Sequence, residues 1–506
     1  MQISANLYRA GITINRCLAW LISAGLGACL IAAEPATSPP LPTAGADTPA
    51  LDAELHEVLR SAGIRPALRG DLQRPVDPRL QRIELHGLDN SGLFPGRRYE
   101  AHNAHEIEAL SLKLTPGDQL ILVGSDWQDA HFTLGAHGTA QAPIFIGAET
   151  AGDVVFSGDA SVRFYGSNLV IMNLVFRDGI LKRQSRSSVL ALGDKAHPAD
   201  NCIVNRITID NVNSADPADW PKLLVNYLSV SGHGNTIANS TFAHLRNYGE
   251  IIATSDTPAP ALQQLHILNN RFIDRPKVDH DPCPYRYKII QIGWSGLQAA
   301  PTGSLIQGNL FEDCASNVEI ISIKASDVFL RNNRFIRCPG AVNIRMGDRA
   351  LVQDNVFDGE NQPGTGGLRV AGRDHVIIGN TFKNLQPAEF SQMWPPPKPP
   401  TRYLAWTFAL VAADFEDSGV TDVAYGRVNH VLISHNRFEH NTGRIALGSP
   451  TPSLTQTLLL PRNVRIEHNT FAGDGKGKAL FDYVAQDATE GSAATGVFLY
   501  DNRFEP

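Results

Sequence analysis

The sequence predicts an all-β chain folded as a right-handed, single-stranded parallel β-helix with a short N-terminal capping helix. The first observation is an Asn-x-Phe motif whose asparagines, from Asn309 onwards, lie 22 to 33 residues apart except for one interval of 56. Recurrence at such intervals is typical of a solenoid. The second is that no unit offers about twelve residues of helical periodicity free of Gly, Asn and Pro, whereas stretches such as VFLRNNRF and HVIIGNTF suit short strands.

The repeated motif predicts how each coil is built. We expect its phenylalanines to fill the interior layer under layer, and its asparagines to occupy a turn of left-handed geometry and to hydrogen-bond to the copies above and below. These roles are architectural and need no ligand. The copies end at Phe242 (with one extra residue), Phe272, Phe311, Phe335, Phe357, Phe382, Phe438, Phe471 and Phe504.

The first fifty residues read as an export signal and a linker. Residues 1–33 contain two arginines, no acidic residue and an apolar run from residue 17, which is typical of a secretory signal cleaved after Ala33. Lipoprotein processing at Cys29 is the second interpretation. Residues 34–50 are rich in Pro and Ala and predict an extended linker. We therefore expect a periplasmic or secreted protein.

Two helices are expected before the strands. Residues 51–103 form an N-terminal extension with a helix candidate at 51–62, and 104–114 has the helical spacing of a cap on the first coil. The β-helix domain is expected to span 104–506. Within it, the Pro- and aromatic-rich segment 386–408 interrupts the repeat and predicts a long loop beside a binding face.

One cysteine pair occupies equivalent positions on neighbouring coils. Cys314 and Cys338 each follow a motif asparagine by five residues. Strands of adjacent coils lie about 4.8 Å apart, which is within the Cα separation that a disulfide accepts. A disulfide and a ladder of two free thiols are both consistent with this spacing, and an exported compartment permits the former.

Composition limits the class of partner. The 506 residues include 44 Lys and Arg against 51 Asp and Glu, a net charge of −7, and 43% are hydrophobic. These values exclude a disordered or collagen-like chain and a multi-span membrane protein, and they argue against general nucleic-acid binding. An anionic partner must therefore meet positive charge that is concentrated locally.

Such a concentration is expected on three consecutive coils. Lys324, Arg345 and Arg369 precede the next motif asparagine by 9, 10 and 11 residues, so they fall near one position and predict a basic column suited to a polyanion. Glu319 lies five residues before Lys324 and is expected to flank the same groove. The alternative is ordinary surface charge.

The residue types favour elimination over hydrolysis. A lysine kept neutral by surrounding positive charge can remove the C5 proton of a uronate, and an arginine can stabilise the resulting anion. A glycoside hydrolase would need two carboxylates facing one bond, and no matching partner for Glu319 is evident.

At these residues the sequence resembles polysaccharide lyase family 6, the alginate lyases and chondroitinase B. The similarity runs from about residue 104 to the C-terminus and is strongest in GNLFEDCASNVEIISIKASDVFLRNNRFIRCPGAVNIRMGD. It implies that Lys324 is the general base and Arg345 the charge-stabilising, proton-donating partner. Arg369, in GGLRVAGRDHVIIGN, stands where alginate-cleaving members carry an arginine.

The resemblance also implies a calcium site, which this sequence retains only in part. The family uses two glutamates flanking one residue and an upstream asparagine, and the corresponding positions read Asn317, Glu319 and Tyr285. Because calcium prefers six to eight oxygen ligands, we expect no tightly bound cofactor. Arg286 and Lys288 are expected to supply fixed positive charge instead.

The leading interpretation is therefore an exported, monomeric lyase that binds and cleaves an alginate-like acidic polysaccharide, without a membrane span. The expected substrate-binding residues are Arg369, Glu319, Lys288, Arg286 and Tyr285. A dermatan sulfate lyase is the second candidate. A β-helical glycan-binding protein without activity is the third.

Overall fold

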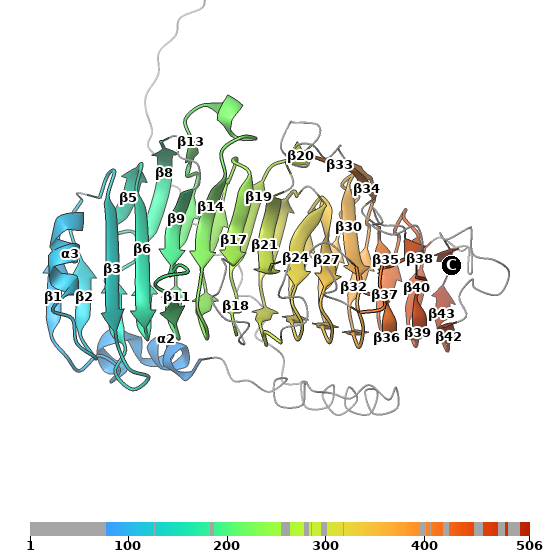
Figure 1. The fold of residues 1–506 in the computed structure, drawn as a ribbon, viewed down its shortest axis with the longest axis horizontal. Coiled ribbons are helices and arrows are strands. Elements are labelled where there is room, and N and C mark those ends of the chain that lie inside the picture. The colour runs from blue at the N-terminus through green and yellow to red at the C-terminus, as the bar shows by residue number, and fades with distance from the viewer. Residues whose placement is uncertain are drawn as a thin grey trace, which may run out of the picture. The chain divides into compact units, whose positions relative to one another are not determined.

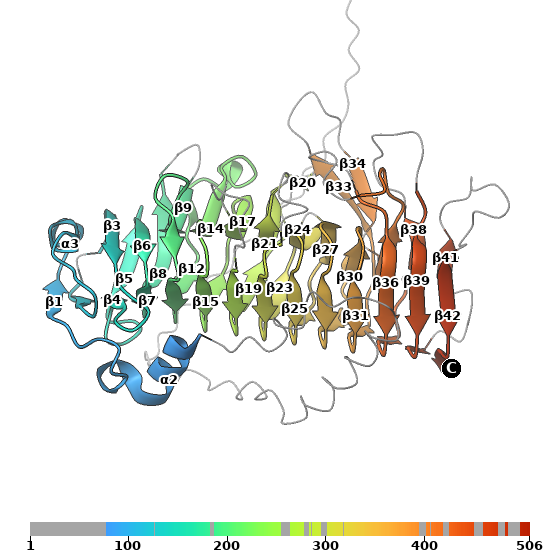
Figure 2. The ribbon, with the colours of Figure 1, turned by 60° about the horizontal axis from the view of Figure 1, so that its bottom comes forward.

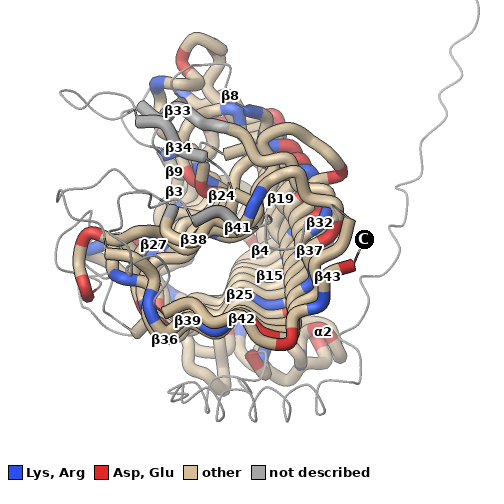
Figure 3. The backbone as a smooth tube through the Cα atoms, turned by 90° about the vertical axis from the view of Figure 1, so that its right-hand side faces the viewer, with Lys and Arg blue, Asp and Glu red and all other residues tan. Residues whose placement is uncertain are grey.

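The computed structural model describes residues 77–505, apart from 126, 183–186, 255–263, 278–282, 285, 295–300, 317, 394–400, 405, 418–424, 450–458, 474–480 and 484–495. The expected signal, linker and 51–62 helix therefore lie outside the described residues. The described strands stack coil upon coil into three long parallel sheets, which confirms the predicted parallel β-helix (Figure 1). Viewed along the stack, successive coils superpose (Figure 3).

Sheet 1 contains 14 described strands in chain order. They are β1 (Arg98–Ala101), β2 (Gln119–Leu122), β4 (Ile144–Gly147), β7 (Leu169–Met172), β11 (Ile203–Asn205), β15 (Thr236–Ala238), β18 (His266–Leu268), β22 (Leu305–Gln307), β25 (Phe329–Arg331), β28 (Leu351–Gln353), β31 (Val376–Ile378), β36 (Asn429–Ser434), β39 (Arg462–Glu467) and β42 (Val497–Tyr500). Its first strand thus precedes the expected domain start at residue 104.

Sheet 2 has 13 described strands and carries the site described below. They are β3 (His131–His137), β6 (Ser161–Ser167), β9 (Ser187–Leu192), β10 (Ala199–Asp200), β14 (Val225–Val230), β17 (Gly249–Thr254), β21 (Tyr287–Gly293), β24 (Glu319–Lys324), β27 (Gly340–Met346), β30 (Thr365–Val370), β35 (Phe408–Val411), β38 (Ile445–Ser449) and β41 (Phe481–Tyr483).

Sheet 3 also has 13 described strands. They are β5 (Val155–Gly158), β8 (Val175–Leu181), β12 (Thr208–Asp210), β13 (Asn213–Ser214), β16 (Thr241–Ala243), β19 (Arg271–Arg275), β23 (Leu310–Cys314), β26 (Arg334–Ile336), β29 (Val356–Asp358), β32 (Thr381–Lys383), β37 (Arg437–Glu439), β40 (Thr470–Ala472) and β43 (Arg503–Glu505). A 3-10 helix, η1, spans Pro217–Asp219.

The Asn-x-Phe motif builds the interior as predicted. Its phenylalanines stack from Phe242 to Phe504 with ring centroids 4.6 to 5.4 Å apart. From Asn270 to Asn502, each asparagine amide donates to the side-chain oxygen of the next at 2.9 to 3.0 Å. From β16 to the last described coil, these two rows join each coil to the next.

We expected the ladder asparagines themselves to have left-handed backbone geometry, and this prediction was wrong by one residue. The left-handed position is the residue before each ladder asparagine, for example Asn332 (φ 54°) before Asn333. In the first copy Asn239 itself has φ 51°, and Ser240 takes the ladder place, its backbone N–H donating to Asn270 Oδ1 at 2.9 Å. The one extra residue of that copy is thereby explained.

Two helices precede or interrupt the first coils. The predicted capping helix is present as α3 (Ala104–Ser111), with Asn103 as its N-cap and Ile107 fully buried. A second helix, α2 (Pro78–Asn90), was not predicted; it buries Leu80 and Ile83. Figure 2 shows α2 beside the first strands of the stack. No helix in the described part of the chain is long and apolar enough to span a membrane.

The segment expected as a loop at 386–408 contains a hairpin. Strands β33 (Glu389–Met393) and β34 (Thr401–Leu404) pair antiparallel, and β20 (Cys283–Pro284) pairs parallel with β33. This small sheet lies ahead of the starts of β21 and β35 in the chain. The segment before β21 is therefore hydrogen-bonded to the segment before β35, although these two strands of sheet 2 are four coils apart.

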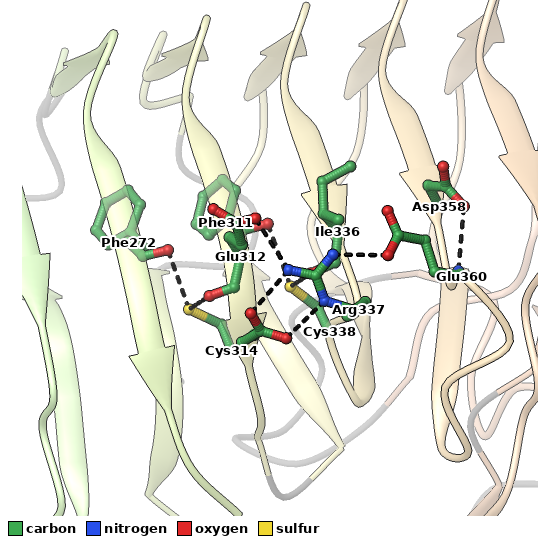
Figure 4. Close-up of polar contacts among 10 residues, drawn as sticks. Phe272, Phe311, Glu312, Cys314, Ile336, Arg337, Cys338, Asp358 and Glu360 are labelled. Atoms are coloured by element: carbon green, nitrogen blue, oxygen red, sulfur yellow. Dashed lines mark hydrogen bonds and ion pairs between the residues drawn. The ribbon is translucent and has the colours of Figure 1, made fainter. Parts of the chain in front are cut away.

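Cys314 and Cys338 are free thiols, so the disulfide is not formed and the alternative ladder is present. Each sulfur donates to carbonyl oxygens of its own and the preceding coil: Cys314 to Phe272 at 3.3 Å, and Cys338 to Phe311 at 3.4 Å (Figure 4). Burial raises the pKa of the Cys338 thiol well above its ordinary value.

Candidate active site

The outer face of sheet 2 changes character along the stack. In β3 and β6 exposed and buried residues alternate, as expected for a sheet with one wet face. In β21, β27 and β30 every residue is buried, including polar and charged ones. Buried charges require partners, so these strands mark a site rather than a plain surface.

The predicted basic residues do occupy neighbouring strands, but not one register position. Lys324 on β24 pairs with Met346 on β27, whereas Arg369 on β30 pairs with Asn343. The register shifts between Ile323 and Lys324 because Arg345 is an extra residue in β27. Such a bulge re-aims a side chain. The single column predicted from spacing is therefore two adjacent rows.

Glu319 is the centre of the charge network. Its Oε2 lies 3.2 Å from Lys288 Nζ, and its Oε1 lies 3.2 Å from Arg345 Nη1 and accepts from Asn343 Nδ2 at 2.7 Å. Burial acts to raise the pKa of this carboxyl, but the charges of Lys288, Arg345 and Lys324 hold it well below its usual range. Glu319 is thus a fixed anion that orients the catalytic-type arginine.

Lys324 is partly exposed at the end of β24. Burial lowers the pKa of its ammonium group well below the usual value, and the charges of Lys288 and Arg345 lower it further, against the opposing effect of Glu319 and Glu250. A lysine whose charged form is disfavoured in this way is suited to accept a proton.

Lys288, on β21, belongs to this network, and Arg286 lies just before the same strand. Arg286 Nε is 3.3 Å from Oε1 of the fully buried Glu250, and Lys288 Nζ donates to Gln291 Oε1 at 2.9 Å. The Arg286 side chain is 26% exposed and the Lys288 side chain 4%. Arg286 can therefore reach a ligand, whereas Lys288 acts from below through its charge.

Two predicted site residues are not described by the structure, and two others belong to the site although they were not predicted. Tyr285 and Asn317 lie outside the described residues. Glu250 and Tyr425 belong to the site and were not predicted, because neither stands in a repeat position that spacing picks out. Arg369 Nη1 donates to Tyr425 Oη at 3.5 Å.

The described residues do not fit a calcium site. Glu319 is the one described carboxylate among the expected ligands, and the ammonium group of Lys288 occupies its Oε2 side. No group of three or more His, Cys, Asp and Glu side chains able to hold a metal occurs in the described ranges. Calcium requires several oxygen ligands, and a carboxylate paired with a lysine ammonium group does not supply them.

A groove of about 800 Å³ continues from the charge network along sheet 2 toward the N-terminal coils. Arg286, Gln291 and Trp294 line the end nearest the network, and small side chains such as Ser229 and Ala253 line its middle. Its far end carries Glu108, His131, Asp159, Arg163 and Asp194. The groove meets the charge network at Arg286 and Gln291, which contact Glu250 and Lys288, respectively.

These features define a class, the polysaccharide lyases with a parallel β-helix and a lysine–arginine pair on one sheet. The sequence model of the chondroitinase B family matches residues 101–449, which is well over half of the chain. The chain belongs to that family. No curated protein matches it.

Solved structures of family 6 lyases share the fold at low identity. A mannuronic acid specific family 6 lyase from human gut microbiota is 22% identical, with a TM-score of 0.62 over 81% of this chain and 82% of that one. Alginate lyase AlyGC is 24% identical, with a TM-score of 0.68 over 80% of this chain, which spans about half (51%) of AlyGC. A family 6 alginate lyase in complex with a trisaccharide is 17% identical, with a TM-score of 0.60 over 83% of this chain and 87% of that one.

Proposed function

We propose that this protein cleaves alginate-like polyuronates by β-elimination, with Lys324 as the base. The observation that carries the proposal is the pairing of a partly exposed lysine of lowered pKa with an arginine that a buried glutamate holds at 3.2 Å. Family membership and the fold shared with structures named as alginate lyases support it.

The proposed reaction removes the C5 proton, delivers another proton to the leaving oxygen, and replaces the C5–H and C4–O bonds with a C4–C5 double bond. Lys324 Nζ takes the C5 proton of a uronate. The electron pair of the C5–H bond forms the C4–C5 double bond, and the C4–O bond to the leaving sugar breaks. Arg345 stabilises the charge that develops on the carboxylate side and donates the proton that the leaving oxygen requires. Glu319 keeps Arg345 in place throughout and remains ionised.

The local charge suits an acidic polymer. The site has more basic than acidic side chains, although the net charge of the chain is −7. Its basic residues are Arg286, Lys288, Lys324, Arg345 and Arg369, and its acidic residues are Glu250 and Glu319. A groove that continues from this network can hold further sugars of the same strand. The carboxylate of the bound uronate would meet Arg286 and Arg369.

Hydrolysis has less support from the geometry. Glu250 and Glu319 are both at the site, but each is buried and ion-paired with a cation. Neither is placed to donate a proton or activate water as a hydrolase pair must.

Dermatan sulfate is the second candidate substrate, because the matching family model is that of chondroitinase B. The presence of Arg369 beside Arg345 supports alginate, since the resemblance places an arginine there in alginate-cleaving members. A binding protein without activity is the third candidate.

We also propose that the reaction needs no calcium. The ammonium group of Lys288 lies against Glu319, where the resemblance implies a metal ligand, and Arg286 adds a second fixed charge. Activity that a chelator abolishes and added calcium restores would contradict this.

The deciding experiment follows the ultraviolet absorbance of unsaturated uronate during incubation with polymannuronate, polyguluronate or dermatan sulfate. We expect product from the first two, none from Lys324→Ala, and retained polymer binding by that variant. The control is Lys383→Ala on sheet 3, which removes an ion pair with Asp358 away from the site and should leave the rate unchanged. Full activity of Lys324→Ala would remove Lys324 from the mechanism.

A further inference from the structure

Tyr425 enters the site from outside the repeat. It lies on a segment between β35 and β36, described as residues 412–417 and 425–428, which we call the strap. The residue is 2% exposed, and its ring faces two guanidinium groups: Cζ of Arg369 is 5.1 Å and Cζ of Arg345 is 5.6 Å from the ring centroid. One aromatic ring therefore serves both arginines.

The strap is tied to the coil that carries Arg369. Gly372 N–H, just after β30, donates to Gly426 O at 3.0 Å, and Arg373 Nη1 lies 2.6 Å from Asp417 Oδ1. Within the strap, Asp414 N–H donates to Tyr425 O at 3.2 Å. The position of the ring relative to β30 is thus set by backbone and ionic contacts on both sides of it.

The shared ring bears on the relative orientation of the two arginines. They stand on adjacent strands as like charges, and Glu319 is placed to fix Arg345 at the level of β24. The negative face of an aromatic ring within about 6 Å attracts a guanidinium, most strongly where water is excluded. A ring shared by both groups offsets their repulsion and sets their relative orientation.

We propose that Tyr425 is a positioning residue that holds Arg345 and Arg369 in the geometry for binding and cleaving a uronate. The inference rests on the proposed function. Its ring faces both arginines, and its hydroxyl accepts a hydrogen bond from Arg369. A tyrosine that only filled the core would affect stability and leave the kinetic constants of the folded enzyme unchanged.

Ring and hydroxyl are separable by substitution. Tyr425→Leu removes both, so we expect kcat to fall about tenfold and KM to rise, in line with two desolvated cation–π contacts. Tyr425→Phe keeps the ring and should restore kcat while KM stays raised by about two- to threefold, because the long hydrogen bond to Arg369 is lost. The kinetic constants are measured on polyuronate, with folding checked by circular dichroism.

The matched control is Tyr500→Leu, which removes an exposed tyrosine with Arg465 at 6.0 Å from its ring, on sheet 1. It should leave kcat and KM unchanged. In an Arg369→Ala background, Tyr425→Leu should lower kcat/KM by a smaller factor than it does in the wild type, because one of the two arginine partners of Tyr425 is already absent. Equal losses in both backgrounds, or wild-type kinetics for folded Tyr425→Leu, would overturn the proposal.

A second readout does not depend on turnover. Calorimetry gives the dissociation constant of polyuronate for Lys324→Ala and for Lys324→Ala combined with Tyr425→Leu, and we expect weaker binding by the latter. If the wild type binds without cleaving, this comparison still decides the role of Tyr425, and equal affinities refute it. If the wild type neither binds nor cleaves any uronate, the proposed function is wrong and the inference falls with it.

Discussion

Lys288 Nζ lies 3.2 Å from Glu319 Oε2, and both side chains are only 4% exposed. A buried anion is thus matched by a cation from the preceding coil, in the place where the family resemblance implies a metal. Two buried charges that satisfy one another add little net stability, but the loss of either partner leaves the other uncompensated. The pair therefore controls both the charge of the site and the position of Arg345.

The first prediction concerns the removal of Lys288. Lys288→Ala leaves the Glu319 carboxylate buried without its ammonium partner, which typically costs about 3 to 5 kcal/mol. We expect a lower melting temperature, because the Glu319 carboxylate keeps Arg345 as an ion-pair partner but loses its ammonium partner. The control is Lys383→Ala, whose partly exposed ion pair should matter little. A melting temperature of Lys288→Ala equal to that of Lys383→Ala would refute the expectation.

The second prediction concerns pH. Lys324 works as a base only when neutral, so kcat/KM should rise as pH increases through its lowered pKa and level off before the usual lysine range near about 10.4. Lys288 lowers that pKa and Glu319 raises it. The rising limb should therefore move to higher pH in Lys288→Gln and to lower pH in Glu319→Gln. Shifts in the same direction in both variants would contradict the assignment of Lys324 as the titrating base.

The spacing of motifs in the sequence was sufficient to predict the stack of coils, and to predict that Lys324, Arg345 and Arg369 lie on neighbouring strands. The Asn-x-Phe motif repeats once per coil, so counting from it places residues of adjacent coils side by side. The count fails by one at β27, where the extra residue Arg345 shifts the register. A bulge adds a residue without changing the motif, which is why one column was expected where two rows exist.

The spacing of the Asn-x-Phe motif did not indicate that two other residues, Glu250 and Tyr425, belong to the site. Glu250 lies two coils before Glu319, and Tyr425 lies on the strap after the interrupted coil. Glu250 reaches the site because β17 pairs with β21 and aligns it with Lys288. Tyr425 reaches it because the connection between β35 and β36 returns to the arginines, which no local periodicity encodes. The hairpin of β33 and β34 was missed for the same reason, because its partner β20 is about a hundred residues earlier in the chain.

The third prediction concerns the asparagine ladder. Asn333 is fully buried; its Oδ1 accepts from Asn309 N–H and Nδ2, and its Nδ2 donates to Ile306 O and Asn355 Oδ1. Asn333→Ala leaves several buried polar groups without partners, at about 1 to 3 kcal/mol each. We expect a clear fall in the urea midpoint of unfolding. Asn502→Ala, at the last described coil, should lower it less, and equal shifts would contradict a cooperative interior ladder.

The fourth prediction concerns the thiols of sheet 3. Cys314 and Cys338 are buried and reduced, so a thiol reagent should leave the native protein unmodified and label both after unfolding in denaturant. Cys202 provides the internal reference, because it is buried on a different coil without a cysteine partner among the described residues, and burial raises the pKa of its thiol to about 12. A reductant should leave the melting temperature unchanged, since a disulfide closing a loop of this size would contribute about 3 kcal/mol. A linked Cys314–Cys338 peptide in a non-reducing digest of freshly purified protein would show that the two coils are cross-linked instead.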